Sequence, residues 1–158
     1  MAKTIVGPEQ QGFVDTPLDP DGNLRRILLG VNESSQDRIS LPMQLASTIS
    51  EPLTSYPFVE THFGAYQGID DGGDQIMLHP RNHPHPFQVF SLQSVQQGKL
   101  KRSDIQGKVV LIGLTAVSIK DTVNSMTLWN QTDSQVNGVE VQAHAVSQLV
   151  SAAIDLVR

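Results

Sequence analysis

Hydrophobic positions recur most regularly near the end of the chain. From Val139 to Leu156 apolar side chains cover most of the helical circumference, and the polar residues fall on one narrow stripe. This pattern predicts an amphipathic helix over about Val139–Leu156, with the polar stripe facing water. Asn137 can cap the first turn, and Glu140 stands three residues further on, as in a capping box. The stripe consists of Glu140, His144, Ser147, Gln148, Ser151 and Asp155.

A second pattern is the continuous apolar run between Lys108 and Gly113, which contains two valines, a leucine and an isoleucine. Such a run, without polar alternation, is typical of a strand that is buried on both faces. We therefore expect a buried central strand at about Lys108–Gly113. A buried strand followed by a largely apolar helix is typical of an α/β layer structure.

The first third of the chain predicts a hairpin and then a helix. The extended-looking runs Gly12–Asp15 and Leu24–Leu29 flank a turn sequence, Asp19–Gly22, and are expected to pair antiparallel. The alternative for Asp19–Gly22, a calcium loop, is disfavoured because no glutamate follows at the required distance. Ser40 is a plausible N-cap for a helix over about Ser40–Glu51.

The middle of the chain, from 53 to 88, is rich in proline and glycine and leaves room for short strands only, the best being Gln75–Leu78. The predicted fold is one α/β domain over residues 1–158. It has a mixed β-sheet around the central strand, flanked by the two helices in a two-layer or three-layer sandwich.

Composition excludes several function classes. The net charge of −5 gives no basic surface for nucleic acid, and the absence of cysteine excludes disulfides and thiolate metal sites. No apolar stretch approaches the roughly 20 residues that span a bilayer. The first residues lack the apolar core of a signal peptide, so we expect any targeting information to lie outside this chain.

Two groups of residues are candidates for chemistry. His79, His83 and His85 have the spacing of a metal cluster, but the prolines beside them favour an exposed loop, and we expect no metal and no cofactor. The polar residues after the predicted strand could meet a ligand at its carboxyl end, although a purely structural loop is the stronger alternative. These candidate ligand residues are Thr115, Ser118, Lys120 and Asp121.

Glu140 and His144, four residues apart on the predicted helix, could form an acid–base pair, although surface pairing explains them equally well. No nucleophile motif such as Gly-x-Ser-x-Gly accompanies them. We therefore expect no enzyme activity.

Read in order, several stretches of the chain resemble the CHASE2 family of extracytoplasmic sensor modules. The resemblance begins at Gly12–Asp15 and Asp19–Gly22 with Arg25-Arg26, and it continues through Gln75–Leu78 with Arg81 and through Ser91-Leu92 with Val95 and Gly98. It ends with Gly107–Gly113, Thr115-Ala116, Lys120-Asp121, Gly138–Ala145 and Gln148-Leu149. This resemblance adds Arg81 to the candidate ligand residues. It also implies that the chain corresponds to the C-terminal part of the module.

The resemblance implies a sensory function in a bacterial transmembrane receptor. The expected location is the extracytoplasmic side of the membrane, periplasmic or extracellular, with transmembrane helices flanking this part of the receptor. The output domain would be a histidine kinase, a nucleotide cyclase, a diguanylate cyclase or a serine/threonine kinase. A stimulus near Thr115–Asp121, or at the loop from Leu53 to Gln88, would shift the C-terminal helix between two arrangements.

Two alternatives remain open. One is a protein-interaction module that forms a homodimer without a small ligand. The other is a metal-dependent enzyme that uses His79, His83 and His85.

Overall fold

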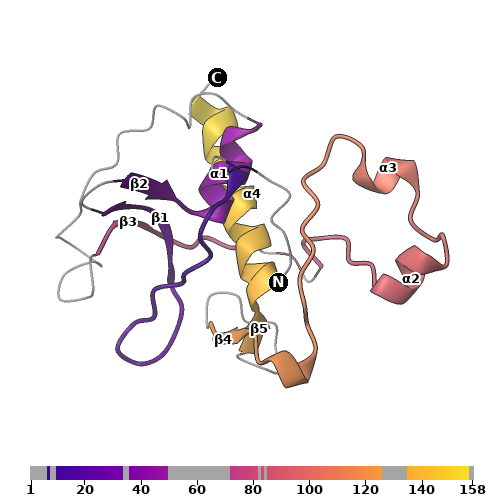
Figure 1. The fold of residues 1–158 in the computed structure, drawn as a ribbon, viewed down its shortest axis with the longest axis horizontal. Coiled ribbons are helices and arrows are strands. Elements are labelled where there is room, and N and C mark those ends of the chain that lie inside the picture. Colours follow the sequence, from indigo (N-terminus) through magenta and orange to yellow (C-terminus); the bar gives the residue numbers. More distant parts are fainter. Residues whose placement is uncertain are drawn as a thin grey trace.

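The computed structural model describes residues 7, 10–33, 36–49, 72–81, 83, 85–125 and 135–156. Helices and antiparallel sheets are combined in an α/β fold, as predicted (Figure 1). The expected end of the first helix at Glu51 and most of the proline- and glycine-rich loop lie outside the described residues.

The central strand of the main sheet is β1 (Arg26–Glu33). It pairs antiparallel with β2 (Gln36–Ile39) on one side and with β3 (Asp74–Met77) on the other, giving the order β2-β1-β3. Alternate residues Ile27 and Leu29 are buried, as expected for a strand with one face on the core. The strand predicted at Gln75–Leu78 is confirmed to within one residue.

The N-terminal hairpin prediction is wrong in its pairing, although its turn is confirmed. Asp19 and Gly22 are joined by a turn hydrogen bond of 2.8 Å, and Leu18 bridges to Leu24 just outside the turn. Phe13, however, pairs with Ser40 and not with the Leu24–Leu29 run. The reason is competition, because β2 and β3 occupy both edges of β1.

Helix α1 (Leu41–Ser47) begins as predicted: the Ser40 hydroxyl accepts a hydrogen bond from the amide of Met43 at 3.4 Å, and Pro42 lies in the first turn. The helix is shorter than the predicted Ser40–Glu51. It ends early because both the amide and the hydroxyl of Thr48 donate to the carbonyl oxygen of Leu45, which closes the last turn.

Helix α4 (Gly138–Leu156) confirms the predicted C-terminal helix. It follows a small antiparallel pair formed by β4 (Thr122–Asn124) and β5 (Gln135–Asn137). The expected capping box is not observed between described residues. Instead, the amide of Gly138 donates to the carbonyl oxygen of Asp121 at 2.9 Å, because Asn137 is held in the strand pair.

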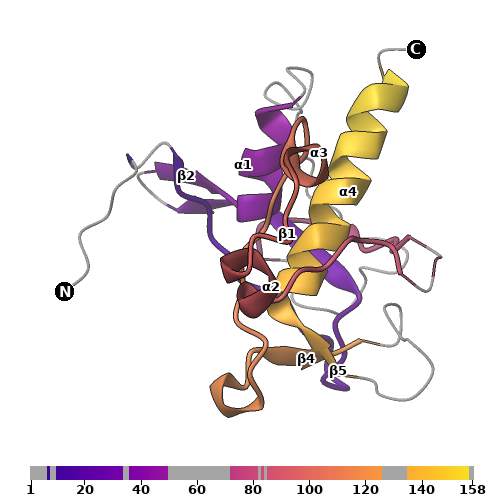
Figure 2. The ribbon, with the colours of Figure 1, turned by 90° about the vertical axis from the view of Figure 1, so that its right-hand side faces the viewer.

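The hydrophobic core lies between the three-stranded sheet and the helices α1 and α4 (Figures 1 and 2). Ala46, Ala145 and Ala153 have no exposed surface, and such small side chains allow two helices to approach closely. The sheet side is supplied mainly by leucine and isoleucine. The buried members are Leu24, Ile27, Leu29, Met43, Ala46, Leu78, Val136, Val141, Ala145, Leu149 and Ala153.

The predicted central strand at Lys108–Gly113 is wrong. The segment runs without regular secondary structure, and 54% of Val110 and 96% of Ile112 are exposed. An apolar, β-branched run favours a buried strand, but it becomes one only where neighbouring strands pair with it. In the part of the chain that the structure describes, no strand lies beside this segment, and β1 takes the central position.

Lys108–Gly113 belongs to a projection that leaves the core and returns to it. The projection contains α2 (Leu92–Gln96) and α3 (Arg102–Ile105), and it stands to one side of the helices in Figure 1. A short 3-10 turn, η4 (Val117–Ile119), follows before β4.

A charged network fixes the Asp19 turn to the sheet. Arg26, with only 2% of its side chain exposed, donates to Asp19 at 2.7 and 3.0 Å and to the side-chain oxygen of Gln75. Arg25 contacts both Asp19 at 2.7 Å and Asp21 at 2.7 and 2.9 Å. The turn sequence that resembles the start of a calcium loop therefore neutralises two arginines.

Gly12 lies where a larger residue does not fit. A Cβ atom at this position would lie 2.4 Å from the backbone nitrogen of Leu41 and 2.5 Å from its Cα. The same backbone is held by the 2.7 Å bond from the Leu41 amide to the Phe13 carbonyl oxygen, so it cannot easily retreat. We expect Gly12→Ala to lower the free energy of unfolding by about 1–3 kcal/mol, measured by urea denaturation. The control Gln11→Ala, at an exposed neighbour, should stay within about 0.5 kcal/mol of the wild type; equal values for the two variants would contradict the packing.

Candidate functional site along helix α4

Polar side chains of α4 hold the segment that follows β3. The Gln148 side chain accepts a hydrogen bond from the His79 amide at 2.7 Å and donates one to the Met77 carbonyl oxygen at 2.9 Å. One amide side chain thus satisfies a backbone donor and a backbone acceptor. The Arg81 guanidinium donates to the Ser147 hydroxyl one residue earlier on the helix. We call these contacts of α4 with residues 77–81 the latch.

His144 completes the latch one turn earlier on α4. Its side chain was expected on the water-facing stripe, but only 3% of the residue is exposed, so this expectation is wrong. The Nδ1 atom accepts a hydrogen bond from the Arg81 amide at 3.3 Å, and the Phe87 ring meets the imidazole edge-on at a centroid distance of 4.8 Å. The sequence pattern predicts a solvent-exposed stripe because it does not show which loop will cover these residues.

The geometry requires a neutral imidazole. Burial, and then the nearby Arg81 charge, lower the pKa of His144 below its ordinary value of 6.5. Protonation would remove the Nδ1 acceptor and place a second positive charge beside Arg81.

Acidification should therefore weaken the fold through His144. A histidine whose folded-state pKa is lowered takes up its proton more readily when unfolded, so stability is full above pH 6.5 and falls as the pH drops below it. One group contributes at most about 1.4 kcal/mol per pH unit. Urea denaturation of the wild type and of His144→Gln over this range should give a steeper slope for the wild type. Parallel slopes would contradict the assignment.

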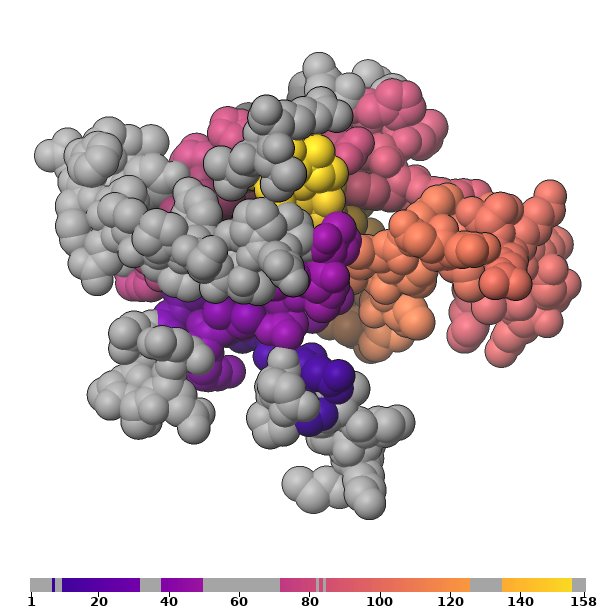
Figure 3. Space-filling view, turned by 90° about the horizontal axis from the view of Figure 1, so that it is seen from above, coloured from indigo at the N-terminus to yellow at the C-terminus, as the bar shows by residue number. Residues whose placement is uncertain are grey.

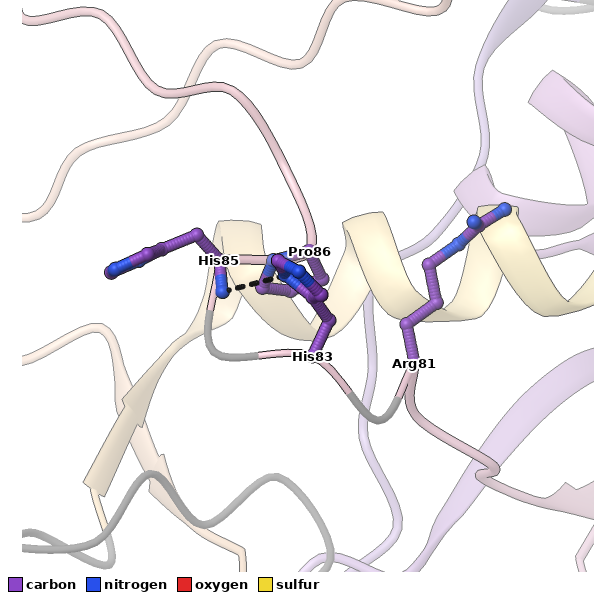
Figure 4. A pocket seen from close by; sticks show the side chains of 4 residues that line it. All are labelled: Arg81, His83, His85 and Pro86. Carbon is purple, nitrogen blue, oxygen red and sulfur yellow. Dashed lines mark hydrogen bonds between the residues drawn. The ribbon is translucent and has the colours of Figure 1, made fainter.

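The three predicted metal candidates do not converge. His83 and His85 line an open hollow of about 480 Å³ with Arg81 and Pro86 (Figure 4). The His85 amide donates to Nδ1 of His83 at 3.1 Å, whereas Arg81 points along α4 and away from both imidazoles. His79 is exposed and bonds to Gln148 through its backbone. Among the residues described, no three histidine or acidic side chains are placed to share a metal ion.

The other candidate ligand residues lie on one exposed loop at the N-terminal end of α4. Asp121 is closest to the helix: a Cβ atom on Gly138 would lie 2.5 Å from its Oδ1 atom. A carboxylate at this end of a helix is favoured by the helix dipole. Lys120 takes the left-handed conformation with a φ of 56°, which directs the chain from η4 into β4. Thr115 and Ser118 are exposed on the same loop.

Arg81 is not brought to this loop. It contacts Ser147, nine residues along α4 from Gly138, which corresponds to about 14 Å of helix. The candidate ligand residues therefore form two groups, one at the N-terminal end of α4 and the other beside Ser147.

A comparison with protein-family models matches the CHASE2 domain over residues 2–158. The chain belongs to the CHASE2 family. No curated protein and no solved structure matches the chain. CHASE2 domains are extracytoplasmic sensory domains of signalling receptors, a non-catalytic role. None of the described helices has the length and apolar character to cross a membrane.

In this CHASE2 domain the sequence did not indicate Phe87, whose ring packs on His144. Ser147 and Gln148 stood out only as members of the polar stripe, and His144 also as a possible partner of Glu140. A usable signal was present, because a stripe that alternates amide, hydroxyl and imidazole groups can bond to a backbone as well as to water.

Proposed function

We propose that this chain is the extracytoplasmic sensory part of a bacterial transmembrane receptor, and that α4 carries the signal. The receptor would anchor it through flanking transmembrane helices, on the periplasmic or extracellular side. Its cytoplasmic output would be a histidine kinase, a nucleotide cyclase, a diguanylate cyclase or a serine/threonine kinase.

The observation that supports a role for α4 is its position between two kinds of contact. One face packs in the core through Val141, Ala145 and Leu149, and the other holds the backbone of residues 77–81 through the latch. The exposed loop with Asp121 meets its first residue. A change at either place acts directly on the helix.

The stimulus would contact either group of candidate ligand residues: Thr115, Ser118, Lys120 and Asp121 at the start of α4, or Arg81 at the latch. A ligand shifts a conformational equilibrium only by its difference in affinity for the two states. Arg81 meets this requirement best, because its amide and its guanidinium both bond to α4 and both bonds would change if the residue were drawn toward a ligand.

The location can be tested by cysteine labelling, since the chain has no cysteine of its own. Asp15 is exposed and shows no ion pair with the residues described. In the full-length receptor, Asp15→Cys should react with a membrane-impermeant maleimide in intact cells, in excess of the unsubstituted receptor. Labelling that requires cell lysis would refute an extracytoplasmic location.

The role of the latch can be tested by output activity in membranes that contain the full-length receptor. Gln148→Leu removes both bonds to the backbone of residues 77–79 and should change the basal output about fivefold or more, the lower range of measured couplings. Ser151→Ala, an exposed position on the same helix, is the matched control. Ser147→Ala provides a milder second variant in case Gln148→Leu lowers receptor abundance. Wild-type output in both latch variants would refute the proposal.

A further inference from the structure

The projection at one side of the molecule makes little contact with the rest of it. We call residues 88–116 the arm and the other described residues the body. None of residues 88–116 is buried. Contacts with the body are found where the arm returns to it: the Ile119 amide donates to the Ala116 carbonyl oxygen at 2.9 Å, and a Cβ atom on Gly113 would lie 2.4 Å from the Cβ of Val139. The space-filling view shows the part of the arm that contains α2 and α3 as a lobe at the edge of the molecule (Figure 3), and the ribbon places both helices to the right of α4 (Figure 1).

The arm exposes an unusual amount of apolar surface. Monomeric proteins rarely leave large apolar side chains clustered in water. A stable interface covers about 800 Å² on each partner, and seven exposed side chains with the adjoining backbone can supply an area of that order. These side chains are Val89, Leu92, Val95, Ile105, Val110, Ile112 and Leu114.

Within the arm, Val109–Leu114 has the properties of a strand without a sheet. Three of its six residues are β-branched, and its backbone amides make no hydrogen bond to any described residue. Such a segment can add to the sheet edge of another chain through main-chain hydrogen bonds.

The charge of the arm, compared with that of the rest of the chain, indicates which partner the arm binds. The chain has 11 basic and 16 acidic residues; the arm holds four basic and one acidic, which leaves seven basic and 15 acidic for the rest of the sequence. The arm is therefore positive and the remainder strongly negative. Two arms would repel each other, whereas an arm and the remainder of a second copy attract.

We propose that the arm is a dimerisation element that docks on the body of a second copy of this chain. The exchange is reciprocal, so each copy gives its arm and receives one, and the assembly closes with twofold symmetry. Val109–Leu114 lies at the centre of the interface, and the basic residues of the arm face acidic residues of the partner. This proposal does not depend on the sensory function.

The experiment is sedimentation velocity of the purified chain over a range of concentrations. We expect a reversible increase in mass to twice 17.2 kDa. Val110→Ser with Ile112→Ser should raise the dimer Kd about tenfold or more, because each change occurs twice in the assembly. Val14→Ser is the matched control: Val14 lies on the body and is 56% exposed, close to the 54% of Val110. Since all three positions are exposed, an unchanged melting temperature at low concentration shows that the variants fold.

Charge reversal separates the two ways in which arms could meet. Lys108→Glu should weaken a dimer in which the arm docks on the acidic body, and it should strengthen a dimer in which two positive arms pair. A tighter dimer with Lys108→Glu would therefore overturn the proposal. So would a monomer at every concentration, or a dimer that is insensitive to Val110→Ser with Ile112→Ser.

Discussion

Replacing Asp19 by alanine is expected to lower the free energy of unfolding by about 3–5 kcal/mol, because the buried Arg26 then loses its charge partner. Only 2% of the Arg26 side chain and 14% of the Asp19 side chain are exposed, and the two are 2.7 Å apart. Most of this decrease in the free energy of unfolding comes from leaving the buried Arg26 charge without a partner, and less from the net contribution of the ion pair. Urea denaturation at neutral pH measures the effect.

The matched control is Asp21→Ala, which removes a neighbouring pair in the same turn. Asp21 contacts Arg25 at the same distance of 2.7 Å, but 51% of its side chain is exposed. Because solvent screens an exposed pair, Asp21→Ala should cost much less stability than Asp19→Ala. Equal losses in Asp19→Ala and Asp21→Ala would show that burial of Arg26 does not set the effect. The double variant Asp19→Leu with Arg26→Met should be more stable than Asp19→Ala.

The same network predicts sensitivity to acid. Burial is the largest effect on Asp19 and opposes its ionisation, but the hydrogen bonds and charges of Arg25 and Arg26 together outweigh it, so the pKa of Asp19 is lowered from 3.8. The contribution of Asp19 is thus complete above pH 3.8 and is lost as the pH falls through the lowered value. Its window lies below that of His144, so the two effects can be separated in one titration.

Leu24→Ala is expected to cost about 2–5 kcal/mol, as deletion of a fully buried leucine leaves a cavity. Leu24 has no exposed surface and joins two parts of the fold. Its side chain lies in the core, while its amide donates to the Asn124 carbonyl oxygen at 2.7 Å and its carbonyl oxygen accepts from the Ser125 hydroxyl at 3.0 Å. The substitution keeps these backbone bonds and removes only the packing.

Leu18→Ala tests this argument at the residue that bridges to Leu24. Leu18 is 48% exposed, so its truncation should change the free energy of unfolding by about 0.5 kcal/mol or less. Thermal or urea unfolding compares the two variants directly. A cost at Leu18 that matches the cost at Leu24 would contradict the assigned core.

The sequence predicts that the candidate ligand loop follows a buried strand at Lys108–Gly113, but the structure places this segment at the surface. The family match over residues 2–158 supports the sensory interpretation without the strand. The exposed apolar side chains of Lys108–Gly113 instead support the proposed contact with a second copy of the chain. The assignment of the chain to the C-terminal part of the module, and the roles of Thr115, Ser118, Lys120, Asp121 and Arg81 as ligand contacts, stay predictions.

Local patterns were sufficient where the decisive interactions are short-range. The sequence by itself determined helix α4 from its apolar periodicity, the start of α1 from Ser40 and Pro42, the turn at Asp19–Gly22 and strand β3. The helices and the turn depend on backbone preferences and on bonds between residues a few positions apart, whereas β3 also needs its distant partner strand β1.

Tertiary structure decided the features that depend on distant partners. Nothing near Phe13 indicates that it pairs with Ser40, and nothing near His144 indicates that Arg81 and Phe87 will cover it. The apolar run at Lys108–Gly113 carries the propensity of a central strand, yet β1 holds that place because β2 and β3 pair with it. Intrinsic propensity determines which secondary structure a segment can adopt, whereas its burial depends on which other segments pack against it.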